Sequence, residues 1–259
     1  AERSSVALSI EHPYEYYSLN VVKSMELFNN LCELGCKKLI FSSTAGIYDD
    51  LPGYMATELS PIKPRSPFTR SKYITEMILR DFCNAYNFNC ISLRYFNPIG
   101  ADPKGRTGPK AVYSKSLLDN LYDITQGKAK SFTISGNDWL TRDSTCIRDY
   151  IHINDVAQAN LKAIENFDYA FTQKNSHTDK SFIALNIGSG VDVTVREFIY
   201  AFENVTGEKI TLNYGERRPG DIGGLYANIN LAKRAIHWEP KLSVEEAILD
   251  YIKWKEKED

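Results

Sequence analysis

The stretch that decides the fold is Lys38-Leu-Ile-Phe-Ser-Ser-Thr44. It is apolar at its start and ends in small hydroxyl residues, a pattern typical of a buried strand whose carboxyl end carries polar groups. In open α/β sheets the carboxyl ends of the strands face the ligand. We therefore expect a strand over residues 38–44 whose terminal hydroxyl groups lie at a ligand-binding edge.

The segments on either side of this strand alternate between helical and extended character. Apolar residues at helical spacing predict a helix over residues 16–34 that ends at Gly35. A second helix is predicted over residues 69–86, and an apolar run over residues 90–96 predicts the next strand. Such alternation is typical of an α/β fold with parallel strands.

The second half of the chain continues this rhythm less regularly. We expect helices over residues 113–127 and from a cap at Asp155 to about Phe167, and strands over residues 131–135 and 182–187. Capping boxes ahead of apolar helical periodicity are matched by Thr194 with Glu197 and by Ser243 with Glu246.

Composition indicates an ordinary globular protein. Of the 259 residues, 43% are hydrophobic and 25% are charged, which is enough apolar material for one large core or two small ones. The formal net charge of −2 gives no reason to expect nucleic acid or an anionic membrane as a partner. No apolar run is long enough to cross a bilayer.

The cysteines predict neither disulfides nor a metal site. There are five of them, and no Cys-x-x-Cys pair occurs. Cys32 and Cys36 lie one helical turn apart, but no pair of His or Cys residues stands nearby to complete a zinc site. Reduced thiols in a cytoplasmic protein are the interpretation that fits.

A Gly-rich phosphate loop is missing from the sequence. A doubly wound nucleotide-binding sheet starts with a strand, a Gly-rich turn and a helix that holds the pyrophosphate at its N-terminus. No such glycine spacing precedes a predicted helix. Gly188-Ser189-Gly190 follows a predicted strand, but a turn from strand to loop explains it better. From the residues alone, the chain is an α/β domain without its own nucleotide site.

Four segments, in this order and spacing, resemble one family. They are Phe41-Ser-Ser-Thr-Ala-Gly-Ile-Tyr48, Leu93-Arg-Tyr-Phe-Asn-Pro-Ile-Gly100, Ile147-Arg-Asp-Tyr-Ile-His-Ile-Asn-Asp155 and Arg217-Arg-Pro-Gly-Asp221. Together they are similar to UDP-glucose 4-epimerases, which are extended short-chain dehydrogenases, and the resemblance covers essentially the whole chain. Decarboxylases and dehydratases of nucleotide sugars share part of the pattern.

The resemblance implies an incomplete doubly wound (Rossmann-like) parallel sheet with a smaller C-terminal substrate-binding lobe. Residues 1–100 and 146–188 would form the partial dinucleotide-binding domain, and residues 101–145 and 189–259 the lobe for the UDP-sugar. Residues 5–20 match the family's region after its fourth strand. We therefore expect the family's Gly-rich turn and first strands to lie before Ala1.

The reaction that the resemblance implies uses NAD as cofactor and a UDP-hexose as substrate. Hydride from C4 of the sugar is held on NAD, a tyrosine removes the 4-hydroxyl proton, and hydride returns to the other face of the turned 4-keto sugar. The tyrosine stands four residues before a lysine, so both share one helix face. The ammonium group then lowers the pKa of the phenol towards the working pH.

This sequence keeps the lysine as Lys72 but has Phe68 at the position of the tyrosine. Phenylalanine lacks the oxygen and can neither accept nor donate a proton, so we expect a rate reduced by at least about 10²–10⁴-fold. Thr44 matches the family's hydroxyl near the sugar O4, and it could pass a proton through water only partially, because a hydroxyl is a weak base. Tyr73 lies about 100° further round the helix and faces elsewhere.

The resemblance assigns the other site residues by position. Cofactor contacts are matched by Ser42, Lys72 and Tyr95, and substrate contacts by Phe96, Asn97, Arg148, Arg218 and Ser116. The planar, always-charged fork of an arginine suits a diphosphate. Taken singly, these residues have plainer interpretations: surface ion pairs for the arginines, a turn before Pro98 for Asn97, core rings for the aromatics and a strand-end hydroxyl for Ser42.

Three departures from the family pattern weaken this assignment. Ser116 stands where the family has an asparagine, and Ser4 and Leu19 stand where the family has a lysine and another polar neighbour of the cofactor. The losses cluster on the cofactor side and at the base, whereas both arginines remain. This pattern favours a protein that binds UDP-sugar over one that turns it over quickly.

Three functions stay open on the sequence alone. The first is interconversion of UDP-galactose and UDP-glucose, impaired in this chain. The second is a non-catalytic UDP-sugar-binding or regulatory module, and the third is another activity on the same scaffold, such as a UDP-sugar decarboxylase. The family commonly forms homodimers through two helices of each subunit, which here would be those over residues 16–34 and 69–86.

Overall fold

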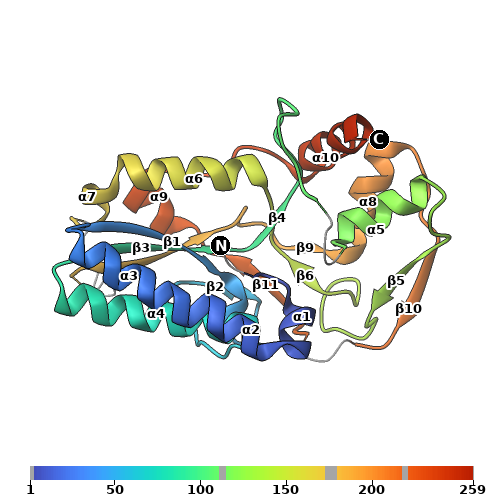
Figure 1. The fold of residues 1–259 in the computed structure, drawn as a ribbon. Coiled ribbons are helices and arrows are strands. Elements are labelled where there is room, and N and C mark those ends of the chain that lie inside the picture. The colour runs from blue at the N-terminus through green and yellow to red at the C-terminus, as the bar shows by residue number, and fades with distance from the viewer. Residues whose placement is uncertain (1–2, 111–114, 173–179, 218–220, 259) are drawn as a thin grey trace.

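The computed structural model describes residues 3–110, 115–172, 180–217 and 221–258. At its centre lies a parallel sheet of three strands in the order β1 (Lys38–Thr44), β3 (Asn89–Tyr95) and β8 (Phe182–Ile187). Helices lie on both faces of this sheet, and a second lobe lies beyond the carboxyl ends of its strands (Figure 1). The predicted α/β class and all three strands are confirmed.

Two long helical segments cover one face of the sheet. After α1 (Val6–Glu11), the first segment runs through α2 (Pro13–Tyr17), a π-helical turn (Ser18–Val22) and α3 (Lys23–Glu33), and the second is α4 (Pro67–Ala85). Side chains of α3, α4, β3 and β8 form one buried cluster beneath them. Both helices were predicted, and each starts earlier than expected because a proline occupies its first turn, where no N–H is needed.

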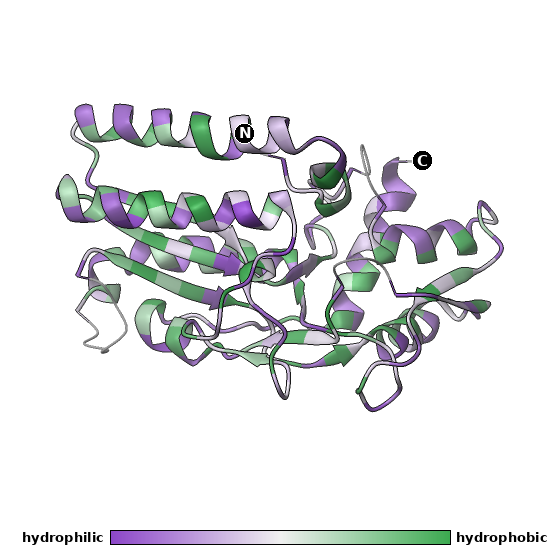
Figure 2. Cartoon of the chain, turned by 90° about the horizontal axis from the view of Figure 1, so that it is seen from below, coloured by the Kyte–Doolittle hydropathy of each residue, from purple (hydrophilic) through white to green (hydrophobic). Residues whose placement is uncertain are grey.

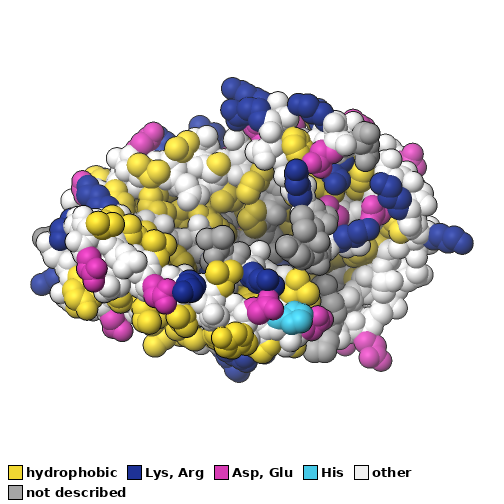
Figure 3. Space-filling model, in the orientation of Figure 1, with side chains coloured by type: hydrophobic (Ala, Val, Ile, Leu, Met, Phe, Trp, Pro, Cys, Tyr) yellow, Lys and Arg dark blue, Asp and Glu magenta, His cyan; other side chains and the backbone are white. Residues whose placement is uncertain are grey.

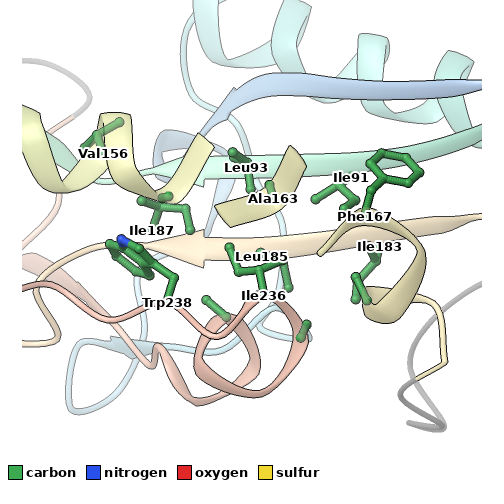
Figure 4. Packing of buried hydrophobic residues seen from close by; sticks show 14 of the residues in the cluster. Ile91, Leu93, Val156, Ala163, Phe167, Ile183, Leu185, Ile187, Ile236 and Trp238 are labelled. Atoms are coloured by element: carbon green, nitrogen blue, oxygen red, sulfur yellow. The ribbon is translucent and has the colours of Figure 1, made fainter. Parts of the chain in front are cut away.

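The other face of the sheet carries α6 (Ile153–Glu165), α7 (Phe167–Ala170) and α9 (Asn230–Ile236). Figure 4 shows how side chains of these helices meet the aliphatic side chains of β3 and β8, with Trp238 closing the cluster at one end. The sheet is therefore covered on both sides, as continuous apolar strands require. The domain boundaries inferred from the resemblance stay a prediction, and α9, which they assign to the second lobe, packs on this sheet.

The second lobe has its own buried cluster. It is built from α5 (Leu117–Thr125), α8 (Val195–Thr206) and α10 (Val244–Glu258) with the parallel pair β5 (Phe132–Ser135) and β10 (Leu212–Gly215). The capping boxes predicted at Thr194 and Ser243 are confirmed, since each hydroxyl accepts the backbone N–H three residues on. These caps fix where α8 and α10 start.

Short strands join the two lobes. β4 (Asn97–Ile99) pairs with β7 (Tyr150–His152), and a small sheet has the order β2 (Met55–Ala56), β11 (Gly224–Ala227), β6 (Ile147–Arg148) and β9 (Val193–Thr194). A short 3-10 turn, Ala45–Ile47, follows β1. These pieces lie at the carboxyl ends of the central strands, where the sequence predicts the ligand (Figure 1).

The predicted cap of α6 is wrong. Asp155 lies inside the first turn of the helix, and His152 is the capping residue, whose Nδ1 accepts the backbone N–H of Asn154 at 3.0 Å. The Asp155 carboxylate instead accepts the backbone N–H groups of Lys241 and Leu242, both at 2.9 Å. An imidazole replaced the expected carboxylate because Asp155 is engaged by a distant segment that the local sequence does not show.

The strands of the central sheet differ in burial. Figure 2 shows hydrophobic stretches along them that are interrupted by hydrophilic residues. All six residues of β8 are buried, whereas only Ser43 is buried in β1. No helix in the described part of the chain is long and apolar enough to span a membrane.

Candidate functional site

The site begins where β1 and β3 end. These parallel strands run in register, with Thr44 beside Tyr95, so the chain leaves both strands at the same edge. The Thr44 hydroxyl accepts the backbone N–H of Gly46 at 3.2 Å. A Cβ on Gly46 would lie 2.8 Å from the methyl group of Thr69, so this glycine lets the start of α4 approach the end of β1.

Helix α4 carries Phe68 and Lys72 on one face. A capping box starts the helix: the Ser66 hydroxyl accepts the Thr69 N–H at 3.2 Å, and the Thr69 hydroxyl accepts the Ser66 N–H at 3.1 Å. Phe68 is 8% exposed and Lys72 only 3% exposed. The predicted lysine therefore lies inside the protein, one turn after the ring that replaces the phenol.

The Lys72 ammonium is held beneath the edge of the sheet. Its Nζ donates to the backbone carbonyl of Ser42 at 2.5 Å and lies 5.0 Å from the centre of the Phe41 ring. Buried ammonium groups need such acceptors, because a lost hydrogen bond there costs more than at the surface. Lys72 is thus fixed relative to the last residues of β1.

Polar contacts link the three predicted cofactor residues, which are Ser42, Lys72 and Tyr95. The Ser42 hydroxyl lies on the exposed side of β1, 3.2 Å from the Tyr95 hydroxyl. Tyr95 in turn donates to the Asn160 side chain of α6 at 2.9 Å. Lys72, Ser42 and Tyr95 thus form a continuous polar path across β1 and β3 to the opposite face.

A cavity of about 360 Å³ brings five of the predicted residues together. Thr44, Phe68, Phe96, Asn97 and Arg148 all line it. The rest of its wall includes apolar residues of α1 and β11 and the charged groups Arg65 and Asp221. Residues from six separate parts of the chain therefore meet in a space large enough for a hexose-sized group.

A second cavity of about 650 Å³ continues from the first and shares Phe96, Asn97 and Arg148 with it. Ser116 lines this second cavity at the start of α5. Its hydroxyl donates to Asp119 at 2.6 Å and accepts the Asp119 N–H at 3.1 Å, so it caps α5. The Ser116 oxygen could therefore accept a hydrogen bond from a ligand but could not donate one.

Arg148 lies where the two cavities meet. Its guanidinium donates to the carbonyl oxygens of Ile147, at 2.7 Å, and of Ile222, at 3.4 Å. The second of these bonds ties Arg148 to Ile222, which lies just before β11. Arg218, the other predicted diphosphate ligand, lies outside the described residues.

The Gly188-Ser189-Gly190 turn has its donors occupied. The backbone N–H groups of Ser189 and Gly190 and the Ser189 hydroxyl all donate to the buried Asp149 carboxylate, at 2.5, 3.0 and 2.7 Å. A Cβ on Gly188 would lie 2.5 Å from that carboxylate. The contacts confirm a strand-to-loop turn rather than a phosphate loop.

A buried ion pair behind the site was missed by the sequence analysis. Arg94 of β3 forks onto Glu76 of α4, with N···O distances of 3.0 and 2.7 Å, and both side chains are at most 1% exposed. Arg94 also donates to the Tyr48 hydroxyl at 2.8 Å, and Tyr48 donates to Asn186 at 2.7 Å. The sequence feature that could have indicated this ion pair is Arg94, a charged residue inside the apolar run of β3.

Electrostatics within this network follow from its burial. Burial by itself raises the pKa of the Glu76 carboxyl, but the hydrogen bonds and charge of Arg94 outweigh it, so the pKa lies below its usual range. Burial raises the pKa of the Tyr48 phenol, although Arg94 opposes this effect. Tyr48, which lines the smaller cavity, therefore stays protonated.

Comparison with known proteins places this geometry in a family. The family described as GDP-mannose 4,6 dehydratase matches residues 1–251. A UDP-glucose 4-epimerase of Bacillus subtilis is 35% identical over 97% of this chain and 72% of its own length. UDP-glucose 4-epimerase 4 of rice is 36% identical over 98% of this chain and 67% of its own length.

The chain belongs to the UDP-glucose 4-epimerase family. Two solved epimerases share its fold. The enzyme from Stenotrophomonas maltophila, with bound NAD and formylated UDP-arabinopyranose, superposes with a TM-score of 0.90 at 30% identity and is covered to 75% of its length by this whole chain. The enzyme from Bifidobacterium longum, in complex with NAD+ and UDP, gives 0.86 at 31% identity, covering 99% of this chain and 75% of its own.

Proposed function

We propose that this chain forms the sugar-binding and catalytic part of a UDP-hexose 4-epimerase site in which Phe68 prevents normal proton transfer. The observation that carries the proposal is the smaller cavity. It gathers Thr44, Phe68 and Asn97 beside Arg148, and the buried Lys72 follows Phe68 by one helical turn. The interconversion of UDP-galactose and UDP-glucose is the reaction that this arrangement supports best.

NAD is the proposed cofactor, and the residues present fit its nicotinamide end. Lys72 and Ser42 offer an ammonium group and an exposed hydroxyl, and the Tyr95 hydroxyl stands beside them. When bound, NAD would accept hydride from the sugar. Within the 259 residues no Gly-rich turn suits its pyrophosphate, so these three residues are proposed only for the nicotinamide end.

Proton transfer is the step that this chain performs poorly. The Lys72 ammonium would stabilise a phenolate on the next turn of α4, but Phe68 offers no oxygen there. Thr44 lies at the same cavity and can relay a proton only through water, because its hydroxyl is a weak base. Turnover should therefore be lower than in a member of the family with tyrosine at this position.

The substrate would extend through both cavities. We place the hexose in the smaller cavity, near Thr44 and Asn97, and the nucleotide end towards Ser116 in the larger one. Arg148 lies between the two, where a diphosphate linking sugar and nucleoside would pass. Its guanidinium, together with that of Arg218, would bind this group through charge-assisted hydrogen bonds.

The decisive experiment restores the phenol oxygen at position 68. Phe68→Tyr in the natural protein, assayed for conversion of UDP-galactose to UDP-glucose with NAD present, should raise kcat by about 10²–10⁴-fold. Adding Lys72→Met to Phe68→Tyr should remove most of this gain, because the phenol then loses the adjacent ammonium group. Phe171→Tyr, which alters a ring remote from the cavity, serves as the matched control and should leave kcat unchanged.

A second function has its own supporting observation. The base position is apolar while Arg148 remains at the cavities, which suits a protein that binds UDP-sugar without converting it. If Phe68→Tyr gives no gain although UDP-sugar binds with micromolar or better affinity, the epimerase proposal is wrong and the binding module is favoured. If UDP-sugar does not bind at all, both proposals fail.

We also propose a homodimer formed through α3 and α4. These helices lie side by side, as the edge-to-face contact of Phe28 with Phe82 shows. Figure 3 shows hydrophobic side chains exposed over them, and they include Val22, Met25, Leu27, Met77 and Tyr86, each at least 42% exposed. Such a patch is typical of an interface.

The dimer can be tested by sedimentation. Met77→Glu should shift the protein to monomers, because it places a charge in the interface, whereas Leu140→Glu on the second lobe should not. A wild-type monomer at micromolar concentration would refute the dimer. A cytoplasmic location is proposed as well, because the five cysteines, all of which lie among the described residues, form no disulfide.

A further inference from the structure

The segment of residues 221–225, which leads into β11, forms part of the cavity wall. Asp221, Ile222 and Leu225 line the smaller cavity. The Gly223 carbonyl accepts the N–H of Ile147 at 2.9 Å, and the Ile222 carbonyl accepts from the Arg148 guanidinium at 3.4 Å. The position of Arg148 therefore depends on where this segment lies.

One tryptophan, Trp139, lies close to both Arg217 and Gly223. The Arg217 guanidinium lies 3.9 Å from the centre of the Trp139 ring, within the range of a cation–π interaction. Gly223 also lies close to this indole, because a Cβ placed on the glycine would be 3.3 Å from the ring. Trp139 is 9% exposed although it belongs to a loop.

Neighbouring groups hold this arrangement in place. Asp138 binds Arg217 twice, accepting from Nε at its carboxylate at 2.8 Å and from the guanidinium at its carbonyl at 3.0 Å. Gly136 has φ +78°, and a Cβ there would lie 2.5 Å from the indole nitrogen and 2.9 Å from the Arg217 side chain. Only glycine permits this close stack.

The loop that carries Trp139 is fixed at its other end. The Tyr54 hydroxyl donates to the Leu140 carbonyl at 2.9 Å. Asp143 accepts from the Thr194 hydroxyl at 2.6 Å, where α8 begins. The loop is thus a support for the segment and is anchored to both lobes.

We propose that Trp139 and Arg217 are positioning residues for substrate binding. Arg217 has its guanidinium engaged by Asp138 and Trp139, so it serves as an anchor and the substrate is bound elsewhere. The indole, held by Arg217, lies beside Gly223 and so limits the movement of the Ile222 and Gly223 carbonyls, which bond to Arg148 and Ile147. This inference rests on the proposed function, because it assumes that Arg148 binds the diphosphate.

The first test measures the positioning itself. Trp139→Ala should accelerate amide hydrogen exchange at Ile147 and over residues 221–225, because the support of the Gly223 carbonyl is lost. Leu140→Ala, a change at the adjacent residue that is 93% exposed, is the matched control and should leave exchange unchanged. Unaltered exchange in Trp139→Ala would overturn the inference whether or not UDP binds.

The second test measures the consequence for binding. Calorimetric titration with UDP should give a dissociation constant about tenfold higher for Trp139→Ala, because Arg148 is then held less firmly in its binding position. Trp139→Tyr keeps a ring face for Arg217 and should restore most of the affinity. In the Phe68→Tyr background, Trp139→Ala should raise KM and leave kcat nearly unchanged.

The outcomes separate the two proposals. If wild-type protein binds no UDP, the proposed function fails, and the exchange experiment still decides the role of Trp139. If wild type binds UDP and Trp139→Ala binds it equally well, the positioning role is refuted. Should Trp139→Ala not fold, Asp138→Asn replaces it, since that carboxylate is 65% exposed, and a severalfold weaker affinity is then expected.

Discussion

The two ends of the substrate cleft are built in opposite ways. At the catalytic end, Lys72 is buried and the Arg94–Glu76 pair behind it is sealed from solvent. At the diphosphate end, Arg148 is supported by a segment whose anchor, Arg217, has a side chain that is 46% exposed. Under the proposed function, the catalytic end has a buried ion pair behind it but no phenol oxygen at Phe68, whereas the diphosphate end keeps Arg148 beside an ion pair that is exposed.

Under the proposed function, this contrast teaches that a chain can lose a catalytic group without losing the fold that holds it. A buried, bidentate ion pair costs several kcal/mol when one partner is removed, so its loss would threaten the fold. Phe68 is buried without a phenol oxygen, so the fold does not require that oxygen. Under the proposed function, this chain therefore keeps the fold of an epimerase while its rate is reduced.

The largest expected effect concerns the buried pair. Glu76→Ala leaves the Arg94 guanidinium without its counter-charge, and the free energy of unfolding should fall by about 3–5 kcal/mol. Urea unfolding followed by circular dichroism measures this. The matched control is Glu26→Ala, which breaks an exposed pair with Lys23 and should cost no more than about 1 kcal/mol. Equal losses of unfolding free energy in Glu76→Ala and Glu26→Ala would contradict the expected difference between buried and exposed ion pairs.

Acid should weaken the catalytic end in a defined range. The folded-state pKa of Glu76 is lowered, so its contribution to stability is present above the unfolded pKa of about 4.3 and is lost as the pH falls through the folded value. The stability advantage of wild type over Glu76→Gln should be constant from pH 7 to about pH 5 and should shrink below about pH 4. An advantage that grows on acidification would contradict this assignment.

At the diphosphate end, loss of a charge should affect binding more than folding. Arg148→Met removes a charge-assisted hydrogen bond worth about 1.5–3 kcal/mol, so the UDP dissociation constant should rise about 10- to 100-fold. Its unfolding free energy should fall by less than that of Glu76→Ala. Arg106→Met, at an arginine that forms an ion pair with Asp102 and lines neither cavity, should leave UDP affinity unchanged.

The smallest effect is expected at the start of α4. Ser66→Ala removes the side-chain acceptor of the capping box and should lower the free energy of unfolding by about 1 kcal/mol. Thermal unfolding in the Phe68→Tyr background should show this loss, and Ser66→Asp should restore most of it. A loss as large as that of Glu76→Ala would mean that the helix start, and not the ion pair, stabilises the catalytic end.

The sequence by itself determined the elements and the chemistry of the catalytic helix. The bounds of β1 follow from an apolar run that ends in hydroxyl residues, and the boxes at Thr194 and Ser243 are read within four residues of chain. Phe68 and Lys72 share a helix face because of their spacing alone. These features depend on near neighbours along the chain, so local patterns suffice to predict them.

Only the tertiary structure decided which distant groups are partners. Glu76 lies 18 residues before Arg94, Asp138 lies 79 residues before Arg217, and Asp155 bonds a segment 86 residues later instead of capping its own helix. Charged side chains have many possible partners in a sequence. The choice among them is made by burial, because a desolvated charge must take whichever partner the packing of the strands and helices brings within hydrogen-bond distance.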